Sequence, residues 1–148
     1  MKLGNFVVEV PDFYTGVDDH PGPVVHKLAL IPSRGTSFDL VAITGHGHPQ
    51  TIESLLSSGA EIYPGDSTRD TLTLAGLPFT HVTVRNSPRF PAPGATLELF
   101  AGLFGNDLLH ATLIQWLDAD RPELFRSMCL RQLEAALNRR LGELMTLE

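Results

Sequence analysis

The pattern of hydrophobic and polar positions predicts a chain made mostly of short strands. Short segments rich in β-branched and aromatic residues, bounded by Gly, Pro, Asn or Asp, are typical of strands. The segments that fit this description are residues 6–10, 24–31, 38–44, 71–75, 79–85, 95–103 and 108–117. Residues 11–23 and most of 60–70 are polar and rich in turn residues, so we predict loops there.

Two segments have the spacing of hydrophobic residues that is typical of helices. The first begins at Pro49, which suits a first turn, and ends before Gly59, which suits the residue after the last turn. The second begins after Asp120, a good N-cap whose backbone N–H the side chain of Glu123 can reach. Its hydrophobic stripe consists of Leu124, Met128, Leu133, Leu137, Leu141 and Leu144.

These elements predict an α+β fold in a single domain that spans residues 1–148. We expect a mostly antiparallel sheet of about six strands, with a short helix and a long C-terminal helix packed on it. The segment Phe104-Gly105-Asn106-Asp107 is a convincing hairpin turn between the last two strands. A length of 148 residues is close to the commonest size of one domain.

Charge limits the kinds of partner that the chain can bind. It carries 17 acidic and 11 basic residues, a net charge of −6, and residues 1–120 hold 13 of the acidic but only six of the basic ones. Because no basic stripe exists, we expect no nucleic-acid partner, and because no apolar run approaches about 20 residues, we expect no membrane association. An acidic surface suits a protein partner with a basic surface.

The single cysteine bears on location and on the long helix. Cys129 cannot form an intrachain disulfide, and the N-terminal residues lack the pattern of a signal peptide, so we expect a cytoplasmic protein. Cys129 lies near the leucine stripe of the second predicted helix, where a structural role in the core is expected. Two copies of the chain could also pair through that stripe, so a homodimer is possible.

One group of histidines could bind a metal ion. His46 and His48 alternate with glycines after a predicted strand, and two histidines at this spacing on an extended segment point the same way. His20, next to Asp18 and Asp19, could complete the site if the acidic loop folds over it. The alternative is that the glycines form a turn and that His48 caps the following helix, with no cofactor bound.

Two other histidines could act as an acid and base pair. His81 with Thr83, and His110 with Thr112, both match the His-x-Thr-x pattern of two-histidine phosphodiesterases. The 29 residues between the two histidines are too few for the lobe that separates these motifs in that family. The alternative is ordinary strand alternation, with a buried, hydrogen-bonded His110.

The order of segments in residues 24–49 resembles the suppressor-of-fused family. A strand ending in Ile31-Pro32 leads through a polar loop to Phe38-Asp39-Leu40-Val41, followed by Thr44-Gly45 and Pro49. Residues 79–88 and 109–137 are similar to later segments of the family, whereas its Ala-Glu-Leu strand and its tryptophan-containing segment are not found. The resemblance covers about half of the chain.

This resemblance implies a binding domain without catalysis or a cofactor. Bacterial members of the family look like immunity or regulatory proteins that hold a protein partner. Candidate binding residues are Asp18 and Asp19 in the acidic loop, His46 and His48, and Trp116, which could be a core residue or the rim of a binding groove. The alternative is a small metal-dependent hydrolase or a two-histidine phosphodiesterase-like enzyme, and the sequence leaves both classes open.

Overall fold

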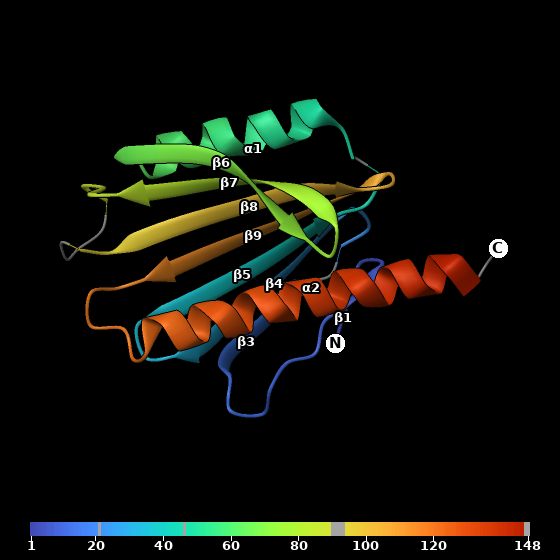
Figure 1. Ribbon diagram of the computed structural model, residues 1–148, viewed down its shortest axis with the longest axis horizontal. Coiled ribbons are helices and arrows are strands. Elements are labelled where there is room, and N and C mark those ends of the chain that lie inside the picture. Colours follow the sequence, from blue (N-terminus) through green and yellow to red (C-terminus); the bar gives the residue numbers. More distant parts are fainter. Residues whose placement is uncertain (21, 46, 90–93, 147–148) are drawn as a thin grey trace.

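The computed structural model describes residues 1–20, 22–45, 47–89 and 94–146 (Figure 1). It confirms the α+β prediction: this part of the chain forms a seven-stranded antiparallel sheet, a two-stranded sheet, a short helix and a long C-terminal helix. The helices are α1 (Pro49–Ile62) and α2 (Pro122–Thr146), and the small sheet pairs β1 (Lys2–Leu3) with β2 (Phe6–Val7). The large sheet contains β3 (Thr15–His20), β4 (Val25–Ser33), β5 (Thr36–Ile43), β6 (Asp66–Leu74), β7 (Leu77–Arg85), β8 (Thr96–Phe104) and β9 (Asp107–Gln115).

The large sheet is built from two meanders that meet in its middle. Strands β3, β4 and β5 follow one another, as do β6, β7, β8 and β9, and the order across the sheet is β3-β4-β5-β9-β8-β7-β6. The pairing of β5 with β9 joins the meanders from Thr36–Gln115 to Ile43–Leu108. Because β9 lies between β5 and β8, it is central, as its apolar pattern predicts. The predicted hairpin turn is confirmed, with Gly105 at φ 59°.

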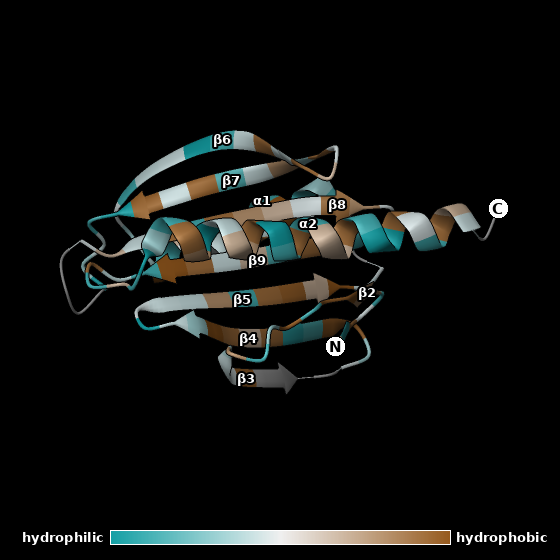
Figure 2. Ribbon diagram, turned by 60° about the horizontal axis from the view of Figure 1, so that its bottom comes forward, coloured by the Kyte–Doolittle hydropathy of each residue, from teal (hydrophilic) through white to brown (hydrophobic). Residues whose placement is uncertain are grey.

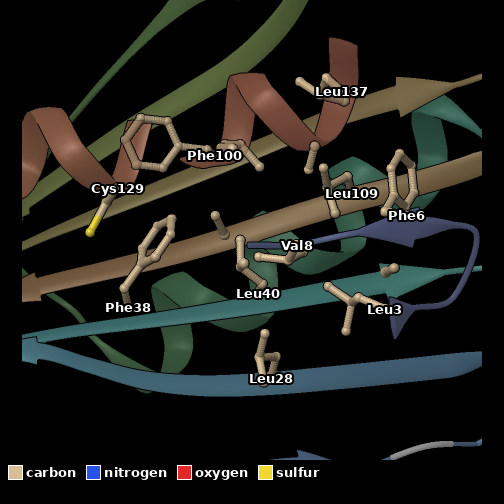
Figure 3. Close-up of a cluster of buried hydrophobic side chains, with 14 of the residues drawn as sticks. Leu3, Phe6, Val8, Leu28, Phe38, Leu40, Phe100, Leu109, Cys129 and Leu137 are labelled. Atoms are coloured by element: carbon tan, nitrogen blue, oxygen red, sulfur yellow. The ribbon is translucent and has the colours of Figure 1, made fainter. Parts of the chain in front are cut away.

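One face of the sheet packs against α2. Side chains of successive strand residues point to opposite faces, so Phe38, Leu40 and Phe100 contribute to the same layer. Figure 3 shows these side chains beneath Cys129 and Leu137 of α2, with Phe6 from the N-terminal hairpin closing one end. The predicted core position of Cys129 is confirmed, because the side chain is fully buried.

The other face packs against α1, although over a smaller area. The side chains of Leu97, Leu99 and Ala101 of β8 point to this face and cluster with Ile52 and Leu56 of α1. Gly59 brings the helix backbone close to the strand, because a Cβ at that position would lie 3.0 Å from Cδ1 of Leu99. In Figure 1, α1 lies on the β6 side of the sheet, and in Figure 2 it is largely hidden behind β8; in both views α2 crosses in front of the middle strands.

Several predicted boundaries are wrong, each for a local reason. The acidic segment predicted as a loop contains β3, which pairs with β4 and has an irregular register between Thr15 and Asp18. Strand β6 begins at Asp66, because pairing with β7 imposes an extended backbone on polar residues. Helix α1 continues past Gly59 to Ile62, since packing on β8 outweighs the low helix propensity of glycine.

Helix α2 differs from the prediction in how it begins and in how much of its hydrophobic stripe is buried. The Asp120 carboxylate accepts hydrogen bonds from Ser33 and Arg121, and Arg121, at φ 41°, holds the position before the helix. Leu133 and Leu137 are buried, whereas Leu124 and Leu144 are exposed. In the residues that the structure describes, neither helix is long and apolar enough to span a bilayer.

Candidate functional site

His81 lies in a network of charged side chains on the α2 face of the sheet. Its Nδ1 is 2.7 Å from Oδ1 of Asp70, and its Nε2 is 2.9 Å from Oε1 of Glu98. The ring stacks on Phe100 with 4.8 Å between the centroids, and Oγ1 of Thr83 is 3.4 Å from Nε2. Strands β6, β7 and β8 supply these residues because the pairing register places Asp70 opposite His81, and His81 opposite Phe100.

Glu98 joins this network to α2. Its Oε2 accepts a hydrogen bond from Nε of Arg126 at 2.8 Å, and its Oε1 accepts one from Nη2 at 2.8 Å. Burial by itself would raise the pKa of Glu98, but the hydrogen bonds and charges of Arg126 and His81 outweigh it and lower that pKa. The pKa of Arg126 is raised, chiefly by its hydrogen bonds to Glu98. Glu98 is therefore held as a carboxylate between Arg126 and His81.

The network holds the fold together more readily than it could transfer a proton to a substrate. Carboxylates only accept hydrogen bonds, and each nitrogen of the His81 ring already faces one. The His81 side chain is also only 12% exposed. We interpret the network as a clamp that fixes β6, β7 and β8 to the first half of α2.

The second His-x-Thr motif lies on the other side of the sheet. His110 and Thr112 of β9 share a face with Leu108 and Ile114, which belong to the cluster under α1. Since His81 belongs to the α2 face, the sheet separates the two histidines, and they cannot act on one phosphate group. Burial alone lowers the pKa of His110 to about 4, so this ring is neutral at pH 7.

His110 belongs to a surface that we name the open face. It comprises the side chains of β4, β5 and β9 that point away from α2 and are half-buried or exposed. These side chains are Val25, Lys27, Ala29, Ile31, Ser37, Asp39, Val41, Ile43, His110, Thr112 and Ile114. Val25 is 51% exposed and Ile31 is 44% exposed, and both belong to this face.

Two titratable side chains in the middle of the open face, Asp39 and His110, are shielded from water. Burial raises the pKa of the Asp39 carboxyl, although the nearby charge of Lys27 partly opposes this effect. Burial lowers the pKa of His110, and Asp39 and His110 are near neighbours because they pair with Thr112 and Val41 respectively. Each of these pKa shifts disfavours the charged form of its side chain, as expected for a group with little access to water.

The other predicted site residues are spread around the molecule. The backbones of Asp18, Asp19 and His20 pair with β4 in strand β3, so the predicted loop cannot fold over as a flap. His46 lies outside the described residues, and His48 is exposed before α1 without a side-chain capping bond. Among the described residues, no group of three His, Cys, Asp or Glu side chains could hold a metal ion.

Trp116 follows β9 and is half-buried against the cluster under α1. Its backbone N–H donates a hydrogen bond to the carbonyl of Gly35 at 2.9 Å, which fixes the end of the strand. Trp116 therefore borders the open face, next to Ile114, and does not lie in the network around His81.

Sequence reasoning missed Asp70, Glu98 and Arg126. A signal for Glu98 was present, because it is the sole charged residue in the strand sequence TLELFAGLF. A charge in a buried strand requires a partner. The identity of that partner, 28 residues later in the chain, depends on how α2 crosses the sheet. Comparison of the chain with family models, curated proteins and solved structures found no significant match.

Proposed function

We propose that this protein is a non-enzymatic binding domain that holds a protein partner on the open face. The role is similar to that of bacterial suppressor-of-fused proteins that act in immunity or regulation, and a cytoplasmic location goes with it. The observation that carries the proposal is the row of exposed and half-buried apolar side chains on β4, β5 and β9. Surfaces of this kind on single chains are commonly interaction sites.

The size of the open face supports this role. Its strands are eight or nine residues long. Three such strands, with standard strand spacing, present about 400 Å². A stable protein complex buries about 800 Å² on each partner, so neighbouring loops and β3 would supply the remainder. The apolar side chains Ala29, Ile31 and Val41 lie among polar ones such as Lys27, Asp39 and Thr112. An interface of this mixed composition is about as apolar as those of many complexes that assemble and separate.

Charge favours a basic partner. Residues 1–120, which form the sheet and α1, carry seven more acidic than basic residues, whereas residues 121–148 carry one more basic residue. Helix α2, with its small positive charge, covers the opposite side of the sheet from the open face. Long-range attraction of a basic surface would accelerate association and favour that partner over acidic ones.

The proposal is tested with Val41→Arg at the centre of the open face. The matched control is Met145→Arg, because Met145 is 75% exposed near the end of α2 and the substitution makes the same change in charge. A partner is captured with the native protein, purified, and titrated against each variant. We expect Val41→Arg to weaken binding at least about tenfold and Met145→Arg to change it less than about twofold.

Unchanged binding of the open-face variant would contradict the proposal. If both variants retain their thermal unfolding temperature and bind the captured partner as tightly as the native protein, the open face is not the binding surface. Ile31→Arg provides a second substitution at the same surface, on a different strand, should Val41→Arg fail to fold.

A further inference from the structure

A cavity of about 400 Å³ lies between α1 and the strands at the β6 edge of the sheet. The strand register builds its floor, because Arg69 of β6 is opposite Val82 of β7, which is opposite Leu99 of β8. A second row begins with Ser67, which is opposite Val84. The helix wall is formed by Leu56, Ala60 and Tyr63. The cavity is thus bounded by four separate elements.

The cavity exists because α1 packs tightly on a single strand. Gly59 allows the helix backbone to approach Leu99 of β8, and β8 is the strand that α1 mainly contacts. Leu56, Val84 and Leu99 are each less than 10% exposed, so the inner wall is apolar. A volume of this size is within the range of small-molecule sites, about 300–1,000 Å³.

One cationic side chain stands at the rim of this apolar cavity. Arg69 pairs with Glu53 of α1, with Nη1 donating to Oε2 at 3.0 Å and Nη2 donating to Oε1. A guanidinium has five N–H donors, so this ion pair leaves three for another acceptor. The Ser67 hydroxyl, on the same face of β6, is exposed beside it. Planar guanidinium groups match carboxylates in geometry and charge.

We propose that this cavity binds a small apolar carboxylate. The hydrocarbon part of the ligand lies against Val82, Val84 and Leu99, and its carboxylate accepts hydrogen bonds from Arg69. Glu53 competes for the same guanidinium and therefore limits the affinity. This site goes beyond the proposed protein-binding function and is separate from the open face, because α1 and β8 lie between them.

The test compares octanoate with 1-octanol, which has the same chain without the charge. Each is titrated into the native protein while two-dimensional NMR follows the backbone amide signals. We expect saturable shifts concentrated in α1, β6 and β7, and we expect octanoate to bind at least about tenfold more tightly than 1-octanol.

Four substitutions assign the two parts of the site. Arg69→Gln is expected to weaken octanoate about tenfold, and Glu53→Gln to strengthen it severalfold because the competing carboxylate is gone. Neither should change 1-octanol binding by more than about twofold. Val82→Phe fills the cavity and should weaken both ligands about tenfold, whereas Val41→Phe, the same change on the half-exposed open face, should weaken neither.

Three outcomes would overturn the proposal. The first is the absence of saturable shifts with octanoate, and the second is equal binding of the two ligands together with no effect of Arg69→Gln. The third is an equal loss with Val82→Phe and Val41→Phe, which would show a nonspecific effect. Ala60→Phe fills the same cavity from the helix side, so the proposal stays testable if Val82→Phe does not fold. Loss of partner binding through the open face would leave these results unchanged.

Discussion

Glu98 is the side chain through which the sheet and α2 are connected electrostatically. It is 9% exposed and accepts hydrogen bonds from Arg126 and His81. Replacement by Gln keeps the volume but removes the negative charge and one of the two acceptor oxygens, so the ion pair with Arg126 is lost and the hydrogen bonds are weakened. We expect the free energy of unfolding at pH 7 to fall by about 1–3 kcal/mol, toward the lower end because Arg126 is partly exposed.

The lowered pKa of Glu98 also predicts how the free energy of unfolding changes at low pH. The pKa of Glu98 is lower in the folded protein than in the unfolded chain, so its contribution is complete above about pH 5 and is lost as the pH falls through the lowered value. Denaturant unfolding between pH 7 and pH 3 measures this effect. Native protein should lose more stability below about pH 4 than Glu98→Gln does, and parallel curves for the two proteins would refute the assignment.

His110 makes a second contribution, in a different pH window. Burial lowers its pKa from 6.5 to about 4, so below pH 6.5 the unfolded chain takes up a proton that the folded protein does not. Stability should therefore fall between pH 6.5 and pH 4, by no more than about 3 kcal/mol. His110→Gln should remove this slope. An NMR titration in which the His110 ring protonates near pH 6.5 would contradict the prediction.

At the scale of elements, the buried part of α2 should account for most of its contribution to stability. Leu133 is 1% exposed, and Leu133→Ala should cost about 2–5 kcal/mol because it leaves a cavity against the sheet. Leu144 lies on the same helix but is 37% exposed, so Leu144→Ala should cost less than about 1 kcal/mol. Denaturant unfolding measures both, and equal costs would show that Leu133 is not a core residue.

The helices and most strands could be predicted because their signals are local. Alternation in residues 38–44 and 108–117, and the leucine spacing of α2, are properties of neighbouring residues. Strand β3 could not be predicted in this way, because the sequence TGVDDH is polar and is held in an extended conformation by its pairing with β4. An edge strand with charged residues has little hydrophobic pattern of its own.

The sites were harder to predict than the elements because they depend on which face each side chain occupies. His81 and His110 have the same local motif, yet they lie on opposite faces of the sheet. The face of each strand is set by register and by the crossing of the helices, and neither is encoded within a His-x-Thr-x segment. The open face and the cavity at Arg69 likewise arise because α1 packs mainly on β8.

At the scale of the whole molecule, charge and shape are arranged asymmetrically. The slightly basic α2 covers one side of the sheet, and its last turns extend beyond the strands (Figures 1 and 2). The remainder of the chain, which is acidic, forms the sheet and the elements on its other side. Burial of Leu133 and Leu137 against the sheet removes the α2 stripe as a pairing surface, so a homodimer would have to form through another surface, such as the open face.

The response of binding to salt separates a basic partner from a second copy. Attraction between the acidic surface and a basic one is screened by salt, so affinity should fall severalfold to about tenfold between low and high ionic strength. Two copies each carry a net charge of −6 and repel one another, so self-association should instead strengthen as salt is added. Calorimetric titration of the partner measures how its affinity changes with salt. Sedimentation of the protein alone, over the same salt series, measures how self-association changes. An affinity for the partner that does not change with salt would refute electrostatic recognition. Self-association that grows with salt and is abolished by Val41→Arg would make the second copy the occupant of the open face.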